Sequence, residues 1–321
     1  MNSEELPLPA EDELLLRKLE KLPAYGKKFR MLRSVQRPEP HAPDALPPGG
    51  RWVALLDIET TGLSATADKV IEIAFLLLAV DADGNVIGLL GPYEYLEDPC
   101  QPLDPAIVQL TGLTNTDLLG KSFDERMILG LLTRTSLLVA HNCSFDAGFI
   151  EQRFPALAGR AWADSCSEID WQRYGFDGRS LGYLLMQAGY FAQGHRAVVD
   201  VFSLHCLLQQ RTEVSGPSYL QLLLEASDRT TVRLEATDSP FSLKDDLRTR
   251  KFHWDSENRV WFRNCELNES ADEECWLIRK GVTHPNAITQ TASERHRPPP
   301  RKLVKVYPWD RAVDDDDAEP F

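Results

Sequence analysis

Two carboxylates stand at the end of a strongly apolar segment early in the chain. Residues 52–56 read W-V-A-L-L, and Asp57 and Glu59 follow directly, ahead of a Thr-Thr-Gly turn. An apolar run that is rich in strand formers and closed by a turn predicts a buried strand. Because side chains alternate between the faces of a strand, Asp57 and Glu59 point the same way. Like charges on one edge repel unless a cation separates them, so the pair could bind a hard divalent ion or be an ordinary solvated surface pair.

A third carboxylate follows another short apolar segment. Leu137 to Ala140 predicts a second strand, and the sequence H-N-C-S-F-D comes directly after it. The pattern places Asp146 at the start of a helix. A metal site formed from two separate strands is a stronger hypothesis than a lone pair of acids, since each further carboxylate adds an oxygen ligand of the kind that Mg²⁺ and Mn²⁺ prefer.

The third segment is G-H-R-A-V-V-D at residues 194–200, which leads into an amphipathic stretch over residues 201–210. Positions five apart on a helix differ by about 140°. His195 and Asp200 therefore meet at one site most easily when the histidine lies on the loop or first turn and the aspartate lies inside the helix. Taken alone, a histidine at this position is more often an ordinary surface residue.

The three segments in this order resemble the DEDDh class of exonucleases, the family of the DNA polymerase III epsilon proofreading subunit and RNase T. The motifs that carry the resemblance are D-I-E-T-T-G, H-N-C-S-F-D and H-R-A-V-V-D, supported by V-I-E-I-A and by I-V-Q-L-T-G-L-T. It covers about residues 52–210. A tyrosine in place of His195 would have indicated the sister class. The resemblance implies an α/β fold of the ribonuclease-H-like type, with a mixed sheet flanked by helices.

The resemblance also implies roles for the charged residues. Asp57 would bridge two metal ions, Mg²⁺ or Mn²⁺, and Glu59 and Asp200 would complete the ligand set of the first. Asp146 would hold the second ion through water. Two such ions stabilise both the attacking and the leaving oxygen of a displacement at phosphorus. His195 is suited to take the proton of the attacking water, because histidine titrates near neutrality.

The implied activity is 3′-to-5′ hydrolysis of single-stranded or frayed DNA, with release of nucleoside monophosphates. By the same resemblance, Thr60 and Leu63 would contact the terminal nucleotide, and Asn142 and Phe145 would position the second motif. RNA is the nearest alternative substrate, since the sequence does not show how the pocket treats a 2′-hydroxyl. An alternative of another class is a catalytically idle adaptor that binds nucleic acid or a polymerase.

Composition predicts a soluble, cytoplasmic enzyme. The chain has 321 residues and is 43% hydrophobic, which is ample for one large core and a second small one. It has no apolar run of about 18 residues and no secretory signal at its N-terminus, so no membrane association is expected. The cysteines lack C-x-x-C spacing and are expected to be reduced thiols; they are Cys100, Cys143, Cys166, Cys206, Cys265 and Cys275.

Charge is unevenly distributed along the chain. The formal net charge is −14, although nucleic-acid binding normally relies on Lys and Arg. Residues 16–37 nevertheless carry basic side chains against the single acid Glu20, and further basic groups lie at residues 244–251 and 295–305. These clusters could contact phosphates or could be ordinary solvated helix faces.

Proline and glycine content predicts four regions. They are a basic arm and linker at residues 1–50, an exonuclease domain at 51–215, a small α+β accessory module at 218–282, and a disordered Pro-rich and acidic tail at 283–321. Residues 11–21 predict a helix in the arm. Ser122 and Glu125 predict a capping box for a helix that begins near Phe123, and Ser242 predicts a cap for a helix at residues 244–248.

The accessory module carries the pattern K-x-x-L-x-x-R-x-F-x-W from Lys244 to Trp254. This pattern resembles a small module of some bacterial proofreading-like exonucleases. Its basic helix and nearby aromatic residues could form a stacking and phosphate-binding surface. A module this small also needs its aromatics for a core, and packing is the favoured prediction for Trp254 and Trp261.

The chain ends A-V-D-D-D-D-A-E-P-F. This ending resembles the acidic tip of bacterial single-stranded-DNA-binding proteins, except that Ala318 and Glu319 stand where the tip has an apolar residue. Phe321 could fill an apolar pocket on a replication or repair protein while the aspartates meet basic groups around it. The tail could instead fold back on the basic arm, or simply be a solvated acidic segment, which is the favoured interpretation.

Overall fold

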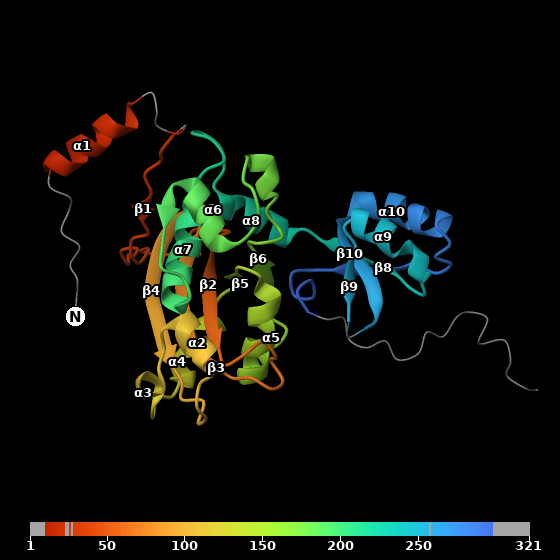
Figure 1. Cartoon of the computed structure of the whole chain (residues 1–321), viewed down its shortest axis with the longest axis horizontal. Helices are drawn as coiled ribbons and strands as arrows, with labels where there is room; N and C mark the ends of the chain where they lie inside the picture. Colours follow the sequence, from red (N-terminus) through yellow and green to blue (C-terminus); the bar gives the residue numbers. More distant parts are fainter. Residues whose placement is uncertain (1–9, 23–25, 27, 257, 298–321) are drawn as a thin grey trace, which may run out of the picture.

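A five-stranded mixed sheet forms the centre of the computed structural model, which describes residues 10–22, 26, 28–256 and 258–297. Its strands are β2 (Arg51–Thr60), β3 (Val70–Val80), β4 (Val86–Leu96), β5 (Leu137–Ala140) and β6 (Trp162–Asp164). The strand order is β4-β3-β2-β5-β6 (Figure 1). β2 to β4 form an antiparallel meander, whereas β5 runs parallel to β2 and β6 parallel to β5. The carboxyl ends of β2, β5 and β6 therefore lie at one edge of the sheet.

Helices cover both faces of this sheet. α6 (Leu181–Ala188), α7 (Ala197–Gln209) and α8 (Tyr219–Asp228) pack on the face to which Val53 and Leu55 point. α4 (Glu125–Leu132) and α5 (Cys143–Arg153) pack on the opposite face, with Ala54 and Leu56. Alternation along β2 thus supplies both cores, and this explains its continuous apolar run. The predicted α/β architecture, a ribonuclease-H-like mixed sheet between helices, is confirmed.

Shorter elements complete this domain. α2 (Pro105–Thr111) and α3 (Asn115–Leu118) cover a small apolar cluster around Ile71. In the arm, α1 (Ala10–Glu20) appears where a helix was expected, and β1 (Arg33–Ser34) pairs with β7 (Tyr190–Phe191). The 3₁₀ turns are η1 (Pro155–Leu157) and η2 (Trp171–Tyr174). The arm is therefore tied to the domain at two places, since His41 also bridges Leu89.

The predicted capping box at Ser122 is wrong. α4 begins at Glu125, and its cap is Asp124, whose carboxylate accepts a hydrogen bond from the Met127 backbone N–H at 3.0 Å. Phe123, which was expected near the start of the helix, is buried in the core just before it. Burial of this ring fixes where the chain enters the helix, so an aspartate one position later supplies the cap.

A second, antiparallel sheet forms the accessory module. Its strands are β8 (Thr231–Ala236), β9 (His253–Asp255), β10 (Val260–Glu266) and β11 (Asn286–Gln290), in the order β11-β8-β10-β9. η3 (Phe241–Leu243), α9 (Lys244–Thr249) and α10 (Leu267–Arg279) complete the α+β module. The 3₁₀ turn η3 runs directly into α9, so Ser242 lies inside the turn and the predicted cap is wrong.

The module has a small core of its own. Leu234, Leu247 and Leu277 are fully buried in it, together with Phe252. Trp261 packs against this cluster, as predicted, whereas Trp254 remains 50% exposed and contacts Trp261 edge to ring. One tryptophan therefore supports the core and the other is largely available to solvent.

The packing divides the chain differently from the predicted boundaries at residues 215 and 282. α8 belongs to the first domain, because Tyr219, Leu220 and Leu223 are buried in its core. Residues 286–290 belong to the module, because β11 pairs with β8. The predicted tail therefore starts too early, and its remaining part, residues 298–321, lies outside the described residues together with the acidic terminus.

Two other composition-based predictions can be compared with the structure. All six cysteines are free thiols, as expected. Within the described ranges, no helix has the length and apolar character needed to cross a membrane.

Candidate active site

β2 carries the first two acids to the functional edge of the sheet. Asp57 and Glu59 lie on the same face as Val53 and Leu55, the face that α7 covers. Ile58, between them, points into the opposite core. Both carboxylates are half-buried, as expected where a strand buried on its two sides reaches the rim of the domain.

α7 brings Asp200 to this pair. Ligand oxygens of Asp57, Glu59 and Asp200 all lie within 4.8 Å of one another. Asp200 is in the first turn of the helix, and its Oδ2 accepts a hydrogen bond from the His195 backbone N–H at 2.8 Å. His195 lies on the loop before the helix with φ 68° and an exposed side chain. The structure thus has the arrangement, histidine on the loop and aspartate in the helix, that the spacing predicted.

Asp146 reaches the same edge from the other layer. It lies in the first turn of α5 and is only 3% exposed. Its negative charge contributes to raising the pKa of Asp57, which places the two carboxylates in each other's field. Asp57, Glu59 and Asp200, from β2 and α7, therefore form one cluster, and Asp146 on α5 lies near enough to act electrostatically on Asp57.

This concentration of negative charge perturbs every member. Burial, followed by the charges of Asp146, Asp200 and Glu59, raises the pKa of Asp57 well above its usual value. Burial and Asp200 raise the pKa of Glu59 to about 8. Burial also raises the pKa of Asp146 and of Asp200. A bound cation would favour the charged form of these carboxylates, and the donor set, which is all oxygen, fits hard divalent ions.

A buried ion pair that the sequence reasoning did not identify fixes the loop that carries His195. Glu72 on β3 is fully buried and accepts hydrogen bonds from the Arg196 guanidinium at 3.0–3.2 Å and from the Ala197 backbone N–H at 3.1 Å. Arg196 also pairs with Glu94 at 2.9 Å. The sequence signal for this pair is a single glutamate, Glu72, inside an otherwise apolar strand. Its partner, Arg196, directly follows His195.

The two predicted substrate contacts differ in exposure. Leu63 is 88% exposed on the turn after β2. Thr60 is buried, and its hydroxyl donates to the Gly62 carbonyl at 2.6 Å. Leu63 is thus free to contact a ligand, whereas the Thr60 side chain shapes the turn.

The two residues expected to position the second motif do contact its surroundings. Asn142 adopts a left-handed conformation with φ 72°, and its backbone N–H donates to Asp164 at 2.7 Å. Phe145 packs against the second core and lies 4.9 Å from the Phe149 ring, between centroids. Both contacts fix the start of α5, from which Asp146 projects.

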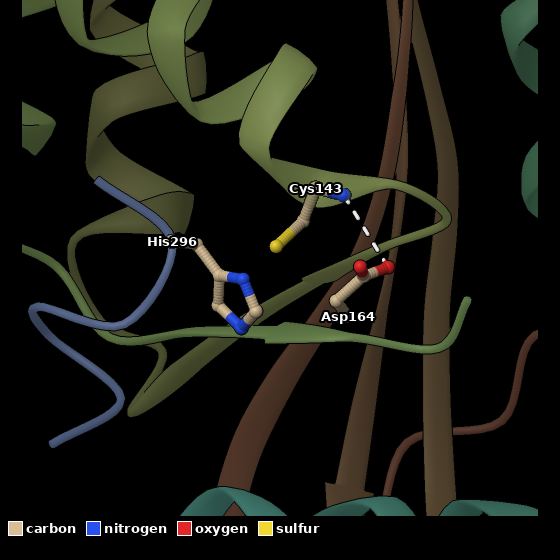
Figure 2. A group of neighbouring side chains, drawn as sticks. All are labelled: Cys143, Asp164 and His296. Carbon is tan, nitrogen blue, oxygen red and sulfur yellow. Dashed lines mark hydrogen bonds between the residues drawn. The ribbon is translucent and has the colours of Figure 1, made fainter. Parts of the chain in front are cut away.

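A second group of potential ligands, Cys143, Asp164 and His296, lies close by (Figure 2). The Asp164 carboxylate already accepts hydrogen bonds from the backbone N–H groups of Asn142 and Cys166, at 2.7 and 3.0 Å, and from the Ser167 hydroxyl. Burial raises the pKa of the Cys143 thiol well above its usual value, which favours the neutral form. We assign this group to the structure of the loops at the edge of the sheet.

Part of the chain is similar to known proteins. Residues 54–205 match the family model described as Exonuclease, RNase T. The PolC-type DNA polymerase III of Bacillus cereus is 41% identical over 108 residues, covering 31% of this chain and 7% of the polymerase. That of Listeria welshimeri is 32% identical over 154 residues, covering 46% of this chain and 10% of the polymerase. The chain thus spans a tenth or less of the length of these relatives.

Solved structures with similar chains include Escherichia coli Exonuclease I in complex with a dA16 oligonucleotide. It is 15% identical, with a TM-score of 0.43, and the match covers 73% of this chain and 70% of that one. Exonuclease X in complex with 5′ overhanging duplex DNA is 19% identical, with a TM-score of 0.37, over 54% of this chain and 90% of that one. Both TM-scores are below 0.5, and the fold described above rests on the strand order instead.

Proposed function

Because residues 54–205 are an exonuclease domain of the RNase T family, we propose that the chain releases nucleoside monophosphates from the 3′ end of single-stranded or frayed DNA. The observation that carries the proposal is the convergence of carboxylates from three elements on one position. Three of them, Asp57, Glu59 and Asp200, place ligand oxygens within 4.8 Å of one another.

Divalent metal ions supply the electrophilic chemistry in this proposal: two bound Mg²⁺ or Mn²⁺ ions would neutralise charge on the phosphate and favour ionisation of a water. Asp57, Glu59 and Asp200 would hold one ion, and Asp146, with Asp57, the other. Their raised pKa values support this assignment, since burial, together with nearby negative charge, disfavours their charged forms and a bound cation would favour them.

His195 takes the proton of the attacking water in this mechanism. Its side chain is exposed on the loop beside Asp200, so it can reach a water molecule at the rim of the site. The ion pair between Glu72 and Arg196 holds the adjacent backbone in place, and thereby limits the positions that the imidazole can adopt.

The terminal nucleotide would lie against the turn after β2. The exposed side chain of Leu63 offers an apolar contact for a base, and the turn that Thr60 stabilises directly follows the strand that carries Asp57 and Glu59. No observation in the described ranges selects deoxyribose over ribose. DNA is proposed because the curated relatives are DNA polymerases.

One assay of end-labelled DNA and RNA oligonucleotides, with and without Mg²⁺, tests the proposal. We expect stepwise shortening from the 3′ end of DNA that needs Mg²⁺ and stops with Asp57→Asn. Faster shortening of RNA would assign the site to RNA instead. Binding of oligonucleotides without any shortening, in Mg²⁺ and in Mn²⁺, would favour an idle adaptor.

The acidic terminus, residues 314–321, remains a proposed contact for a replication or repair protein and lies outside the described residues. Deletion of these residues separates the possibilities. Activity that rises mainly at low salt would indicate that the terminus competes with DNA for the enzyme's own basic groups. Loss of a partner that Phe321→Ala reproduces would indicate docking. A cytoplasmic location follows from these partners and is part of the same proposal.

A further inference from the structure

A cleft of about 670 Å³ lies between the exonuclease domain and the accessory module. The first domain contributes Ser144, Asp164 and Arg179 to its walls, and the module contributes Lys251, with β10, from the other side. Both sheets therefore border the same space, which neither would form alone.

One wall of the cleft adjoins the start of α5, the helix that carries Asp146 in its first turn. Asp164 in this wall accepts a hydrogen bond from the Asn142 backbone N–H at 2.7 Å, and Ser144, exposed in the first turn of α5, also lines the cleft. The carbonyl of Arg179 accepts a hydrogen bond from His141 at 2.6 Å, which ties this arginine to the segment that precedes α5. A nucleic acid whose 3′ end lies at the carboxylates can therefore continue past the start of α5 into the cleft.

Four of the five acids in the cleft walls are paired with arginines, and the fifth, Asp164, accepts hydrogen bonds. Glu168 pairs with Arg295 at 3.0 Å, Asp255 pairs with Arg233 at 2.7 Å, and Asp164 is satisfied by backbone N–H groups. The two remaining acids also have arginine partners: Glu266 pairs with Arg229 at 3.4 Å, and Glu269 pairs with Arg263 at 3.6 Å.

Two cations of the walls are left over. Arg179 and Lys251 are exposed, lie on opposite walls, and have no ion-pair partner among the described residues. In total the cleft walls carry seven Arg and Lys side chains against five carboxylates, although the whole chain carries −14. A positive groove inside an acidic protein attracts phosphates locally while the rest of the surface repels them.

The walls also contain a flat surface suited to a base. Phe262 lines the cleft, and the Arg233 guanidinium lies over its ring, 3.7 Å from the centroid. His253, exposed on the neighbouring strand, lies 6.2 Å from the same ring, between centroids. Aromatic rings beside cationic side chains are the combination that binds single-stranded nucleic acid without sequence preference.

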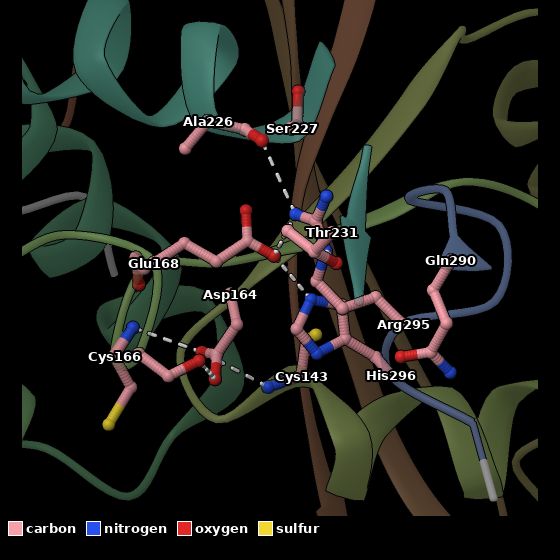
Figure 3. Close-up of polar contacts among 12 residues, drawn as sticks. Cys143, Asp164, Cys166, Glu168, Ala226, Ser227, Thr231, Gln290, Arg295 and His296 are labelled. Carbon is pink, nitrogen blue, oxygen red and sulfur yellow. Dashed lines mark hydrogen bonds and ion pairs between the residues drawn. The ribbon is translucent and has the colours of Figure 1, made fainter. Parts of the chain in front are cut away.

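The cleft has a fixed width because the segment after β11 returns to the first domain (Figure 3). Arg295 and His296 both contact Glu168, and Arg297 binds Glu151 on α5. The Trp162 backbone N–H donates to the Ala292 carbonyl at 3.0 Å. Residues 291–297 are here called the return segment. Their contacts hold the module against the first domain.

We propose that this cleft binds the single-stranded nucleic acid that leads to the 3′ end, with Arg179 and Lys251 contacting its phosphates. The inference rests on the proposed exonuclease activity and adds a second binding region to it. It predicts that long oligonucleotides gain affinity from the cleft, whereas a dinucleotide, which ends at the carboxylates, does not.

The test compares a dinucleotide with a 20-nucleotide single strand, using Arg179→Ala, Lys251→Asn and the double variant of the full chain. Asparagine is chosen because Lys251 has φ 64°, a conformation that asparagine tolerates. For the long substrate, KM should rise about two- to fivefold for each lost charge, with kcat unchanged. The slope of log KM against log salt should fall by about 0.7 for each lost phosphate contact. Neither value should change for the dinucleotide.

Arg134→Ala is the matched control, because Arg134 is exposed just before β5, at the opposite edge of the sheet, and has no ion pair in the described part of the chain. Lys251→Arg should restore the wild-type KM. The inference is overturned if the double variant keeps its KM and salt slope on the long substrate, or if both substrates weaken equally. Failure of the wild type to hydrolyse even the dinucleotide in Mg²⁺ would instead contradict the proposed function.

Discussion

At the scale of single residues, the site is a group of like charges whose mutual repulsion destabilises the folded chain. Asp57, Glu59, Asp146 and Asp200 lie at the edge of a largely apolar sheet, and negative charges among them raise the pKa values of Asp57 and Glu59. An arrangement of this kind persists when a bound cation repays the repulsion, and perturbed carboxylates cluster at functional sites for the same reason. The proposed ligands are buried or half-buried and the proposed base is exposed. Mutations can therefore test the two roles separately.

Replacing a ligand should differ from replacing the base. Asp57→Ala or Asp200→Ala should abolish hydrolysis and weaken Mn²⁺ binding measured by calorimetry, because each removes a direct oxygen ligand. His195→Ala should lose roughly 10²–10⁴-fold in kcat and keep its Mn²⁺ affinity. Asp83→Ala, on an exposed turn, is the control. A His195→Ala variant as active as the wild type across neutral pH would remove histidine from the mechanism.

The stability of the metal-free protein should fall as pH rises. The folded chain binds protons at these carboxyls more tightly than the unfolded chain does, since their pKa values are raised, to about 8 for Glu59. The stabilisation is therefore present at low pH and is lost from the ordinary carboxyl range upward through about pH 8. We expect Tm measured in a chelator to drop between about pH 5 and pH 8. Asp57→Asn should flatten the drop and Asp83→Asn should not; an unchanged slope in Asp57→Asn would show that other groups control it.

At the scale of elements, sequence patterns located what they encode locally. β5 begins and ends at the predicted residues because it is an unbroken apolar run. The caps of α4 and α9 were missed, since the burial of Phe123 and the turn η3 depend on packing. The acidic motifs are local patterns of neighbouring residues, and they therefore predicted the carboxylates. The partner of Glu72 could not be predicted, because Arg196 is 124 positions away and only the assembled fold brings them together.

The Glu72–Arg196 pair should act by positioning an element. Glu72→Gln keeps the size of the side chain but removes the charge that the arginine faces, so we expect lower Tm and a reduced kcat as the start of α7 loosens. Mn²⁺ affinity should change less than it does in Asp200→Ala. Glu94→Gln, at the exposed end of the same arginine, should be milder, because surface pairs contribute only about 0–1 kcal/mol. Equal loss of Mn²⁺ affinity in Glu72→Gln and Asp200→Ala would contradict this role.

At the scale of the whole molecule, residues far apart in sequence decide where a domain ends. α8 comes after the last motif, yet its apolar face completes the first core. Arg51, at the start of β2, donates two hydrogen bonds to the carboxylate of Asp228, at the end of α8. The return segment then crosses back from the module to the first domain. Composition could not show this, because the linker-like residues after 215 resemble a boundary while the helix that follows is part of the domain.

Truncation after residue 215 or after residue 229 should therefore give different results. A chain that ends at 215 exposes the apolar surface under Leu220 and Leu223, and we expect it to be insoluble or to lose about 3 kcal/mol or more of stability, as core deletions do. A chain that ends at 229 keeps that core and should hydrolyse a dinucleotide with an unchanged kcat. Its KM for a 20-nucleotide strand should rise, because one wall of the cleft and the return segment are gone. Equal thermal stability and equal gel-filtration behaviour of the two chains would show that α8 is dispensable to the domain.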